Sequence, residues 1–179
     1  MSGKGPSLTA VIRHPLTGVV VQAVWCDDEL VVRQVLVGSA ARSFIDKAGV
    51  EQPADVPEME GIRSRITAFL NGSVNDLTVI PIDTKENSAF RSAVSAAARK
   101  IPYGTTVTYS QLAVAAGFPG AVRAAASVMR RNRLPLLIPC HRVVRKDGSI
   151  GGYCSVREGA DALLKRRLIA LEASVIGAC

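Results

Sequence analysis

Apolar residues in the first part of the chain come in short, valine-rich runs. The runs are TAVIR (9–13), VVVQAVW (19–25) and LVVRQVLV (30–37), and the polar stretches PLTG (15–18) and DDE (27–29) separate them. β-branched residues favour strands, and apolar runs separated by turn residues are typical of hairpins. We therefore predict an antiparallel sheet of three strands.

The pattern then changes to spacings of three and four. After a polar, proline-containing link at 50–58, four apolar residues share one face of a predicted helix: Met59, Ile62, Ile66 and Phe69. Asn-Gly at 71–72 ends this helix. LTVIPI (77–82) predicts a further strand or an extended link.

Three helices are predicted in the second part of the chain. The first lies within 87–104 and ends at PYG, and the second, 108–117, opens with Thr108 and Gln111 at the spacing of a capping box. The third covers 121–132. Two short helices joined by a tight glycine turn, the second rich in arginine, are typical of a helix-turn-helix.

The last of these helices is predicted to have two faces. The inward face holds Val122, Ala126 and Met129, and the outward face holds Arg123, Ser127 and Arg130. Its small residues, Ala124 to Ala126, would let the helix approach a backbone closely.

Charge also divides the chain. Of the 22 Lys/Arg and 15 Asp/Glu residues, 8 and 11 lie in residues 1–86, and 14 and 4 lie in residues 87–179. With the change of pattern near 82–87, this predicts two domains, 1–85 and 86–179. A basic domain favours a polyanionic partner, and the alternative is a solvated basic surface without one. Charge alone leaves both open.

Composition limits the classes of protein. The hydrophobic content of 48% is enough for a packed core, and charged residues interrupt every apolar run before it could span a membrane. The first 15 residues lack the apolar centre of a signal peptide, so we expect an intracellular protein with no membrane partner. The four cysteines form no CxxC pair, so we expect no metal site.

The segment LLIPCHRVV (136–144) carries the candidate chemistry. The apolar run LPLLI (134–138) is expected to be a buried strand that emerges at Cys140. Cys140 is then either a buried structural thiol or a nucleophile, because a neighbouring histidine and arginines increase the thiolate fraction of a cysteine. His141 is adjacent in the chain, so it could act as a base through a water molecule.

A carboxylate that could orient His141 is predicted in the last helix, 160–173. Its apolar face holds Leu164, Leu168 and Leu171, which places Glu172 at the edge of the packed face. A half-buried carboxylate needs a partner. An ion pair with Arg142, Arg166 or Arg167 and a hydrogen bond to His141 both stay open.

PCHRVV (139–144), preceded by Asn132 and LPLLI and followed by DGSIGGY (147–153), resembles the active-site segment of the O6-alkylguanine-DNA alkyltransferases. The resemblance extends upstream through 101–113 and 121–132 and covers roughly 87–175. It implies a mixed α/β fold, in which a small antiparallel-sheet domain of ribonuclease-H-like type precedes a mostly helical domain with a helix-turn-helix.

The resemblance also implies roles for the residues of the cysteine segment. Cys140 would accept the alkyl group, His141 would activate it through water, and Glu172 would hold His141. Asn132 would tie the end of the recognition helix to the cysteine segment. Val143, Tyr153 and Cys154 would line the guanine pocket.

Further roles concern DNA. Tyr109 would press on the target phosphate and donate a hydrogen bond to the flipped base, and Arg123 would fill the space that the base leaves. DNA would also be contacted by Ala124, Ser127 and Arg130, the first two of which are small enough for close approach to the minor groove.

The function that the resemblance implies is DNA repair by direct reversal. One alkyl group would pass from O6 of guanine, or O4 of thymine, in double-stranded DNA to Cys140, irreversibly and without a cofactor. We expect a monomer, with cooperative assembly on DNA left open. The alternatives are a non-repairing alkyltransferase-like protein that only binds lesions, which would lack the acceptor cysteine, and an unrelated Cys-His hydrolase or transferase. The segment 153–165 is longer than is usual in the family, and Cys154 stands where serine or glycine is common.

Overall fold

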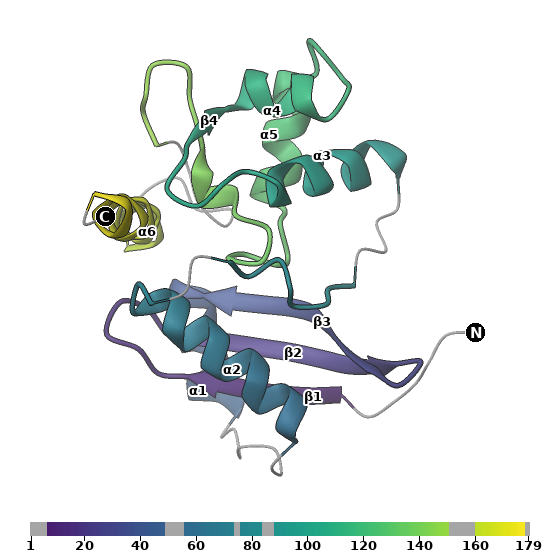
Figure 1. Cartoon of the computed structure of the whole chain (residues 1–179), viewed down its shortest axis with the longest axis vertical. Coiled ribbons are helices and arrows are strands. Elements are labelled where there is room, and N and C mark those ends of the chain that lie inside the picture. The colour runs from purple at the N-terminus through teal and green to yellow at the C-terminus, as the bar shows by residue number, and fades with distance from the viewer. Residues whose placement is uncertain (1–6, 49–55, 74–75, 84–87, 151–159, 178–179) are drawn as a thin grey trace. The chain divides into compact units, whose positions relative to one another are not determined.

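The chain divides into two compact units, Met1–Asp83 and Thr84–Cys179. The computed structural model describes residues 7–48, 56–73, 76–83, 88–150 and 160–177 (Figure 1). The predicted fold class is confirmed: the first unit contains a small antiparallel sheet with helices, and the second is mostly helical. The roles expected for domains 1–85 and 86–179 stay a prediction.

The sheet of the first unit is formed by the three predicted strands. They are β1 (Ser7–Ile12), β2 (Val19–Cys26) and β3 (Glu29–Val37), paired antiparallel in the order β1-β2-β3. Asp27 and Asp28 form the two-residue turn between β2 and β3, with φ of 47° and 66°. Positive φ at both central residues matches the twist of a tight hairpin, and aspartate tolerates it.

Two helices cover the sheet, one on each face (Figure 1). The predicted one is α2 (Pro57–Leu70), which buries all four residues of its expected apolar face. The other, α1 (Gly38–Ala48), was not predicted; its Phe44 and Ile45 pack against Val11 and Val20 of the sheet. Coverage on both faces explains why β2 is apolar almost throughout.

The expectation of a strand or extended link at 77–82 was right only at its end. Thr78 N donates to the Asp76 carboxylate, 2.7 Å, and Ile80 N donates to Leu77 O, 3.2 Å, so the segment begins as a turn. Only Ile82 pairs, in a single parallel bridge with Val32 of β3.

Three helices pack together in the second unit, as predicted. They are α3 (Ala89–Arg99), α4 (Tyr109–Ala115) and α5 (Val122–Arg130). After α4, Gly117 has φ of 84° and Phe118 N donates to Ala113 O, 2.9 Å. This is the Schellman arrangement, which requires a residue that tolerates left-handed φ. It ends α4 and turns the chain toward α5.

A short parallel pair brings the start of α4 beside the cysteine segment. β4 (Val107–Thr108) pairs with β5 (Val143–Val144), in the register Val107↔Val143 and Thr108↔Val144. The helix α6 (Ala160–Ile176) belongs to the same unit and contacts the 3-10 turn η1 (Cys140–Arg142).

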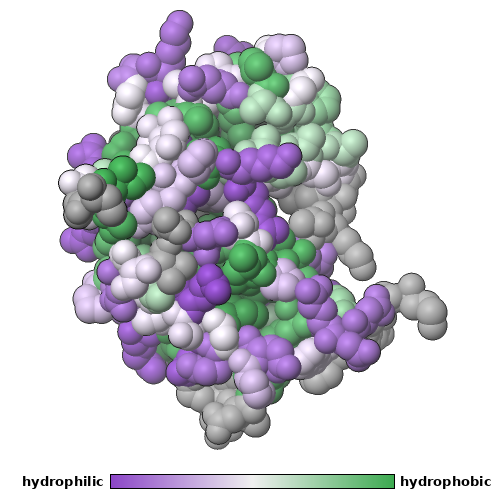
Figure 2. Space-filling model, viewed as in Figure 1, coloured by the Kyte–Doolittle hydropathy of each residue, from purple (hydrophilic) through white to green (hydrophobic). Residues whose placement is uncertain are grey.

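Hydrophilic residues form much of the surface seen in the space-filling view, with hydrophobic residues between them (Figure 2). Within the described residues, the large hydrophobic side chains with the greatest exposure are few: Val79, Val114, Phe118, Leu163 and Ile176. Among the same residues, no helix combines the length and the hydropathy that a membrane span needs.

The N-terminus of α4 supplies a test of local stability. Thr108 Oγ1 accepts from Gln111 N, 3.2 Å, and Gln111 Oε1 accepts from Thr108 N, 2.7 Å, which is the predicted capping box. Thr108→Ala should lower the free energy of unfolding by about 1 kcal/mol, since one backbone donor loses its partner. Urea unfolding measures the loss. Thr108→Ser should recover most of it, and equal midpoints for the wild type and the alanine variant would contradict the role of the cap.

Candidate active site

The segment that precedes Cys140 is a buried turn, so the expected strand at 134–138 was wrong. Ile138 N donates to Leu134 O, 2.7 Å, and Leu136 has φ of 74°. A left-handed leucine is costly and persists only where its surroundings hold it. Here Leu134, Leu136 and Leu137 are all buried, and the turn delivers Cys140 into η1 with 4% of its surface exposed.

Asn132 fastens this turn to the end of α5. Its Oδ1 accepts from Leu134 N, 2.9 Å, and its Nδ2 donates to Ile138 O, 2.8 Å. The same amide nitrogen lies 3.2 Å from Cys140 Sγ, within hydrogen-bonding distance. An amide donor stabilises a thiolate more than a thiol, so Asn132 is placed both to position the sulfur and to favour its ionised form.

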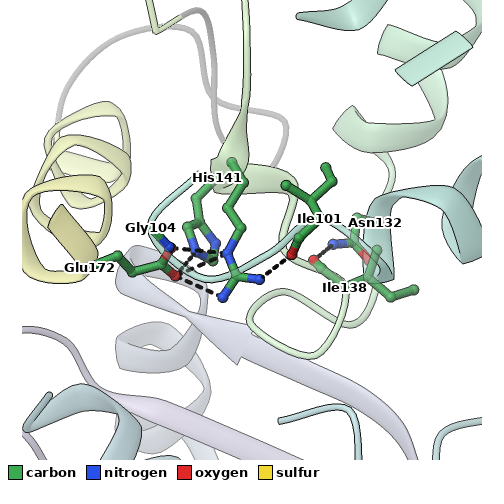
Figure 3. A network of polar contacts seen from close by, with 7 residues as sticks. Ile101, Gly104, Asn132, Ile138, His141 and Glu172 are labelled. Carbon is green, nitrogen blue, oxygen red and sulfur yellow. Dashed lines mark hydrogen bonds and ion pairs between the residues drawn. The ribbon is translucent and has the colours of Figure 1, made fainter. Parts of the chain in front are cut away.

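Glu172 is the centre of a buried polar network on the other side of the cysteine segment (Figure 3). His141 Nε2 lies 2.7 Å from Oε1, and Gly104 N donates to Oε2, 2.9 Å. Arg142 donates through Nε to Oε2, 2.9 Å, and through Nη2 to Oε1, 3.0 Å. Of the partners that the sequence left open, two therefore bind the same carboxylate, His141 and Arg142.

The electrostatics of this network follow from burial and pairing. Burial alone would raise the pKa of Glu172, but its hydrogen bonds to His141 and Arg142 outweigh this and hold its pKa below the ordinary value. Burial lowers the pKa of His141, and the charges of Arg142 and Lys165 lower it further, against the opposite effect of Glu172. The arrangement therefore favours an anionic carboxylate and a neutral imidazole.

Tyr109 is the first residue of α4 and half-buried. Burial raises the pKa of its phenol, the Cys140 sulfur raises it further, and Arg145 lowers it. The pairing of β4 with β5 accounts for this proximity, because it sets Tyr109 beside the segment that carries Cys140 and Arg145. The phenol therefore stays protonated at neutral pH and can donate a hydrogen bond.

The predicted faces of α5 are partly corrected. The buried residues are Ala125, Val128 and Met129, whereas Ala126 is only half-buried, so the inward face is rotated from the expected one. The residues of this helix that were expected to contact DNA are accessible: Arg123, Ala124 and Arg130 are exposed, and Ser127 is half-buried.

Two residues of the site were missed from the sequence. Lys165 is completely buried, and its Nζ donates to Val143 O, 2.6 Å. Its burial could have been predicted from its position directly after Leu164, on the inward side of α6. Gly104 has φ of 70°, and a Cβ there would collide with the Ile176 side chain of α6. A glycine at this position allows the backbone N–H of residue 104 to reach Glu172.

The remaining site predictions concern Val143, Tyr153 and Cys154. Val143 is buried in β5, and its carbonyl accepts from Lys165. Tyr153 and Cys154 lie outside the described residues. In the part of the chain that the structure describes, no group of three His, Cys, Asp or Glu side chains is placed to hold a metal ion.

Known proteins are similar to this chain in sequence. A family model described as 6-O-methylguanine DNA methyltransferase, DNA binding domain, matches residues 89–174. The bifunctional transcriptional activator/DNA repair enzyme Ada of Escherichia coli is 48% identical over 101 residues, which are 56% of this chain and 28% of Ada. The methylated-DNA–protein-cysteine methyltransferase of Methanothermobacter thermautotrophicus is 34% identical over 161 residues, 90% of this chain and 82% of the relative.

The fold has counterparts among solved structures. The crystal structure of Mycobacterium tuberculosis OGT in complex with DNA superposes with a TM-score of 0.72 at 24% identity, covering 94% of this chain and 93% of OGT. The family model covers the helical unit that contains Cys140, which places this unit in a class of DNA-binding domains. The sequence matches define it further: the chain belongs to the methylated-DNA–protein-cysteine methyltransferase family.

The buried network predicts how stability depends on pH. The pKa of His141 is lowered from its ordinary 6.5, so below that pH the unfolded chain binds a proton that the folded chain does not. The folded state should therefore lose stability as pH falls below about 6.5, by up to ~1.4 kcal/mol per pH unit from this group. Glu172, whose pKa is also lowered, adds a loss in the same direction in more acidic solution.

Thermal melts between pH 7.5 and 5 measure this dependence. His141→Gln should flatten the slope, whereas His14→Gln, at the chain's other histidine, should leave the His141 contribution in place. An identical slope in wild type and His141→Gln would contradict the assignment.

Proposed function

We propose that this chain repairs alkylated DNA by transferring one alkyl group from O6 of guanine, and from O4 of thymine, to Cys140 Sγ. The observation that carries the proposal is the pair of opposed contacts at the cysteine segment. Asn132, just beyond the end of α5, holds the sulfur, and Glu172 orients the neighbouring His141 from α6. Family membership supports the same reaction, because the relatives are named for methyl transfer from DNA to a protein cysteine.

The reaction needs an acceptor for the thiol proton. The lone pair of a neutral His141 takes this proton through one water, and Sγ attacks the alkyl carbon in line with the bond to O6. As the S–C bond forms, the C–O6 bond breaks and its electron pair passes to guanine. Tyr109 donates a proton to the departing base, and its phenolate recovers one from solvent.

The product explains why the protein acts once. Cys140 becomes a thioether, which has no ready leaving group, so the sulfur is not regenerated. These bond changes require no cofactor. A protein of this kind is consumed by its own substrate, and the amount of repair equals the amount of protein.

DNA enters through the helix-turn-helix. An alkylated O6 inside a duplex is out of reach of a sulfur, so the nucleotide must be flipped out, at a cost of a few kcal/mol that is lower for damaged base pairs. The exposed Arg123 of α5 offsets part of this cost by filling the vacated space. The small Ala124 and half-buried Ser127 suit close approach to the minor groove, and Arg130 suits phosphate contact. One monomer contains all these groups.

Cys140→Ala tests the acceptor. The variant should bind a duplex with O6-methylguanine but transfer nothing, because the nucleophile is absent. Intact-mass spectrometry should show that the wild type gains one methyl group per molecule and that this variant gains none. Cys26→Ala, at a half-buried cysteine of β2, is the matched control and should gain the methyl group as the wild type does.

Two results would overturn the proposal. Methyl transfer to Cys140→Ala would exclude this sulfur as the acceptor. An unmodified wild type that binds the lesion tightly would support the lesion-binding alternative instead.

Arg123→Ala tests whether this side chain fills the space that the flipped base leaves. The variant should bind a duplex lesion roughly tenfold more weakly, a loss of about 1.4 kcal/mol, because less of the flipping cost is offset. Binding to the single-stranded lesion, which needs no flipping, should change little. Fluorescence anisotropy measures both, with Arg42→Ala, an exposed arginine of α1, as the control. Equal losses on the two substrates would contradict this role.

A further inference from the structure

Arg142 follows the catalytic histidine in the chain, yet its guanidinium is turned inward and only 7% of the residue is exposed. Its Nε and Nη2 donate to the two oxygens of Glu172, at distances between 2.9 and 3.1 Å. Its Nη1 donates to Ile101 O, 2.7 Å, and the guanidinium carbon lies 5.5 Å from the centroid of the Tyr103 ring. An arginine stays charged in any protein environment, so this side chain is a permanent buried cation.

The pairing decides which group neutralises Glu172. A forked guanidinium that donates to both carboxylate oxygens is the strongest partner available to a carboxylate. His141 contributes one hydrogen bond, from Nε2, and the backbone of Gly104 contributes another. The negative charge of Glu172 is therefore balanced by Arg142, and the imidazole is not needed as its counter-ion.

The position of the His141 proton follows from this balance. An ionised carboxylate only accepts hydrogen bonds, so Nε2 must carry the proton that it shares with Glu172. The other ring nitrogen, Nδ1, is buried and makes no hydrogen bond to any of the described residues. A neutral His141 thus presents the lone pair of Nδ1 as its basic site.

Charged groups around His141 disfavour a second proton. From α6, the carboxylate of Glu172 and the ammonium group of Lys165 act on the imidazole, and Arg142 acts from η1. The phenol of Tyr103 and the thiol of Cys140 belong to the same surroundings and are uncharged when protonated. Arg142 and Lys165 already disfavour positive charge on the imidazole, so an imidazolium would add a further positive charge to a buried site.

We propose that Arg142 is a positioning residue for the alkyl transfer: by neutralising Glu172 it keeps His141 an uncharged base whose lone pair is on Nδ1. This inference rests on the proposed function, in which a neutral His141 accepts the proton that Cys140 loses when a lesion binds. Without Arg142, the uncompensated carboxylate would draw a second proton onto His141. The base would then be occupied before the reaction began.

A direct test uses DNA-free protein whose histidines carry an NMR-active nitrogen isotope. The chain has two histidines, so nitrogen NMR shows two imidazoles, and His14→Gln assigns them. In the wild type at neutral pH, His141 should carry a proton on Nε2 and none on Nδ1. In Arg142→Gln, the pH at which Nδ1 becomes protonated should rise by about 1–3 units, the effect of leaving an opposite charge unbalanced.

Arg142→Lys is the second variant, because it keeps a charge and loses the fork. It should shift the same midpoint upward by less than Arg142→Gln does, and it keeps the inference testable if the glutamine variant fails to fold. A doubly protonated His141 in the wild type at neutral pH would overturn the inference. So would a midpoint that does not move in whichever of the two variants folds.

The rate of methyl transfer provides the functional readout. Its acidic limb should move to higher pH in the Arg142 variants, in step with the NMR midpoint, whereas a purely structural loss would lower the rate equally at every pH. The experiment distinguishes failure of the proposed function from failure of the charge balance. If the NMR results hold but the wild type gains no methyl group, the proposed function is wrong and the charge balance of the site stands.

Discussion

The buried carboxylate of Glu172 is the interaction on which the second unit depends. It accepts from the Gly104 backbone and from the adjacent His141 and Arg142, so with α6 itself three segments far apart in sequence meet at two oxygen atoms. A buried charge is tolerated only when it is fully paired, and removing one partner leaves the others uncompensated. The same contacts that hold α6 against the rest of the unit therefore also set the orientation and charge of the histidine.

Asn132 plays the corresponding part on the opposite side of the sulfur. Three hydrogen bonds from one amide join the end of α5 to the buried turn and to Cys140. The helix expected to contact DNA and the atom expected to react are thus separated by a single side chain. The geometry of the sulfur is set by the position of that helix rather than by a flexible loop.

Much of this arrangement could be predicted from the sequence, for physical reasons that differ between elements. The strands and α2 were predicted because their apolar residues repeat with a clear period, and the start of α4 because its capping box is local. The helix α1 was missed, although Ala41, Phe44 and Ile45 lie at spacings of three and four along its inward face. The turn before Cys140 was taken for a strand, since an apolar run does not reveal the left-handed backbone at Leu136.

The partners of Glu172 show a different limit. Spacing along α6 placed the carboxylate at the edge of a packed face but could not choose between His141 and three arginines, because the choice is made by segments that meet only in three dimensions. Burial of the carboxylate allows both contacts at once. Gly104 was missed for the same reason, as its role lies in its closeness to α6.

The distribution of the network along the chain has a consequence for synthesis. A ribosome that has produced the helix-turn-helix, Cys140 and His141 has not yet produced the carboxylate, which arrives about thirty residues later, on α6. Until then Arg142 has no counter-ion and the histidine has nothing to orient it. A nascent chain can therefore contain the helices proposed to contact DNA before α6 supplies the carboxylate that completes the network around His141.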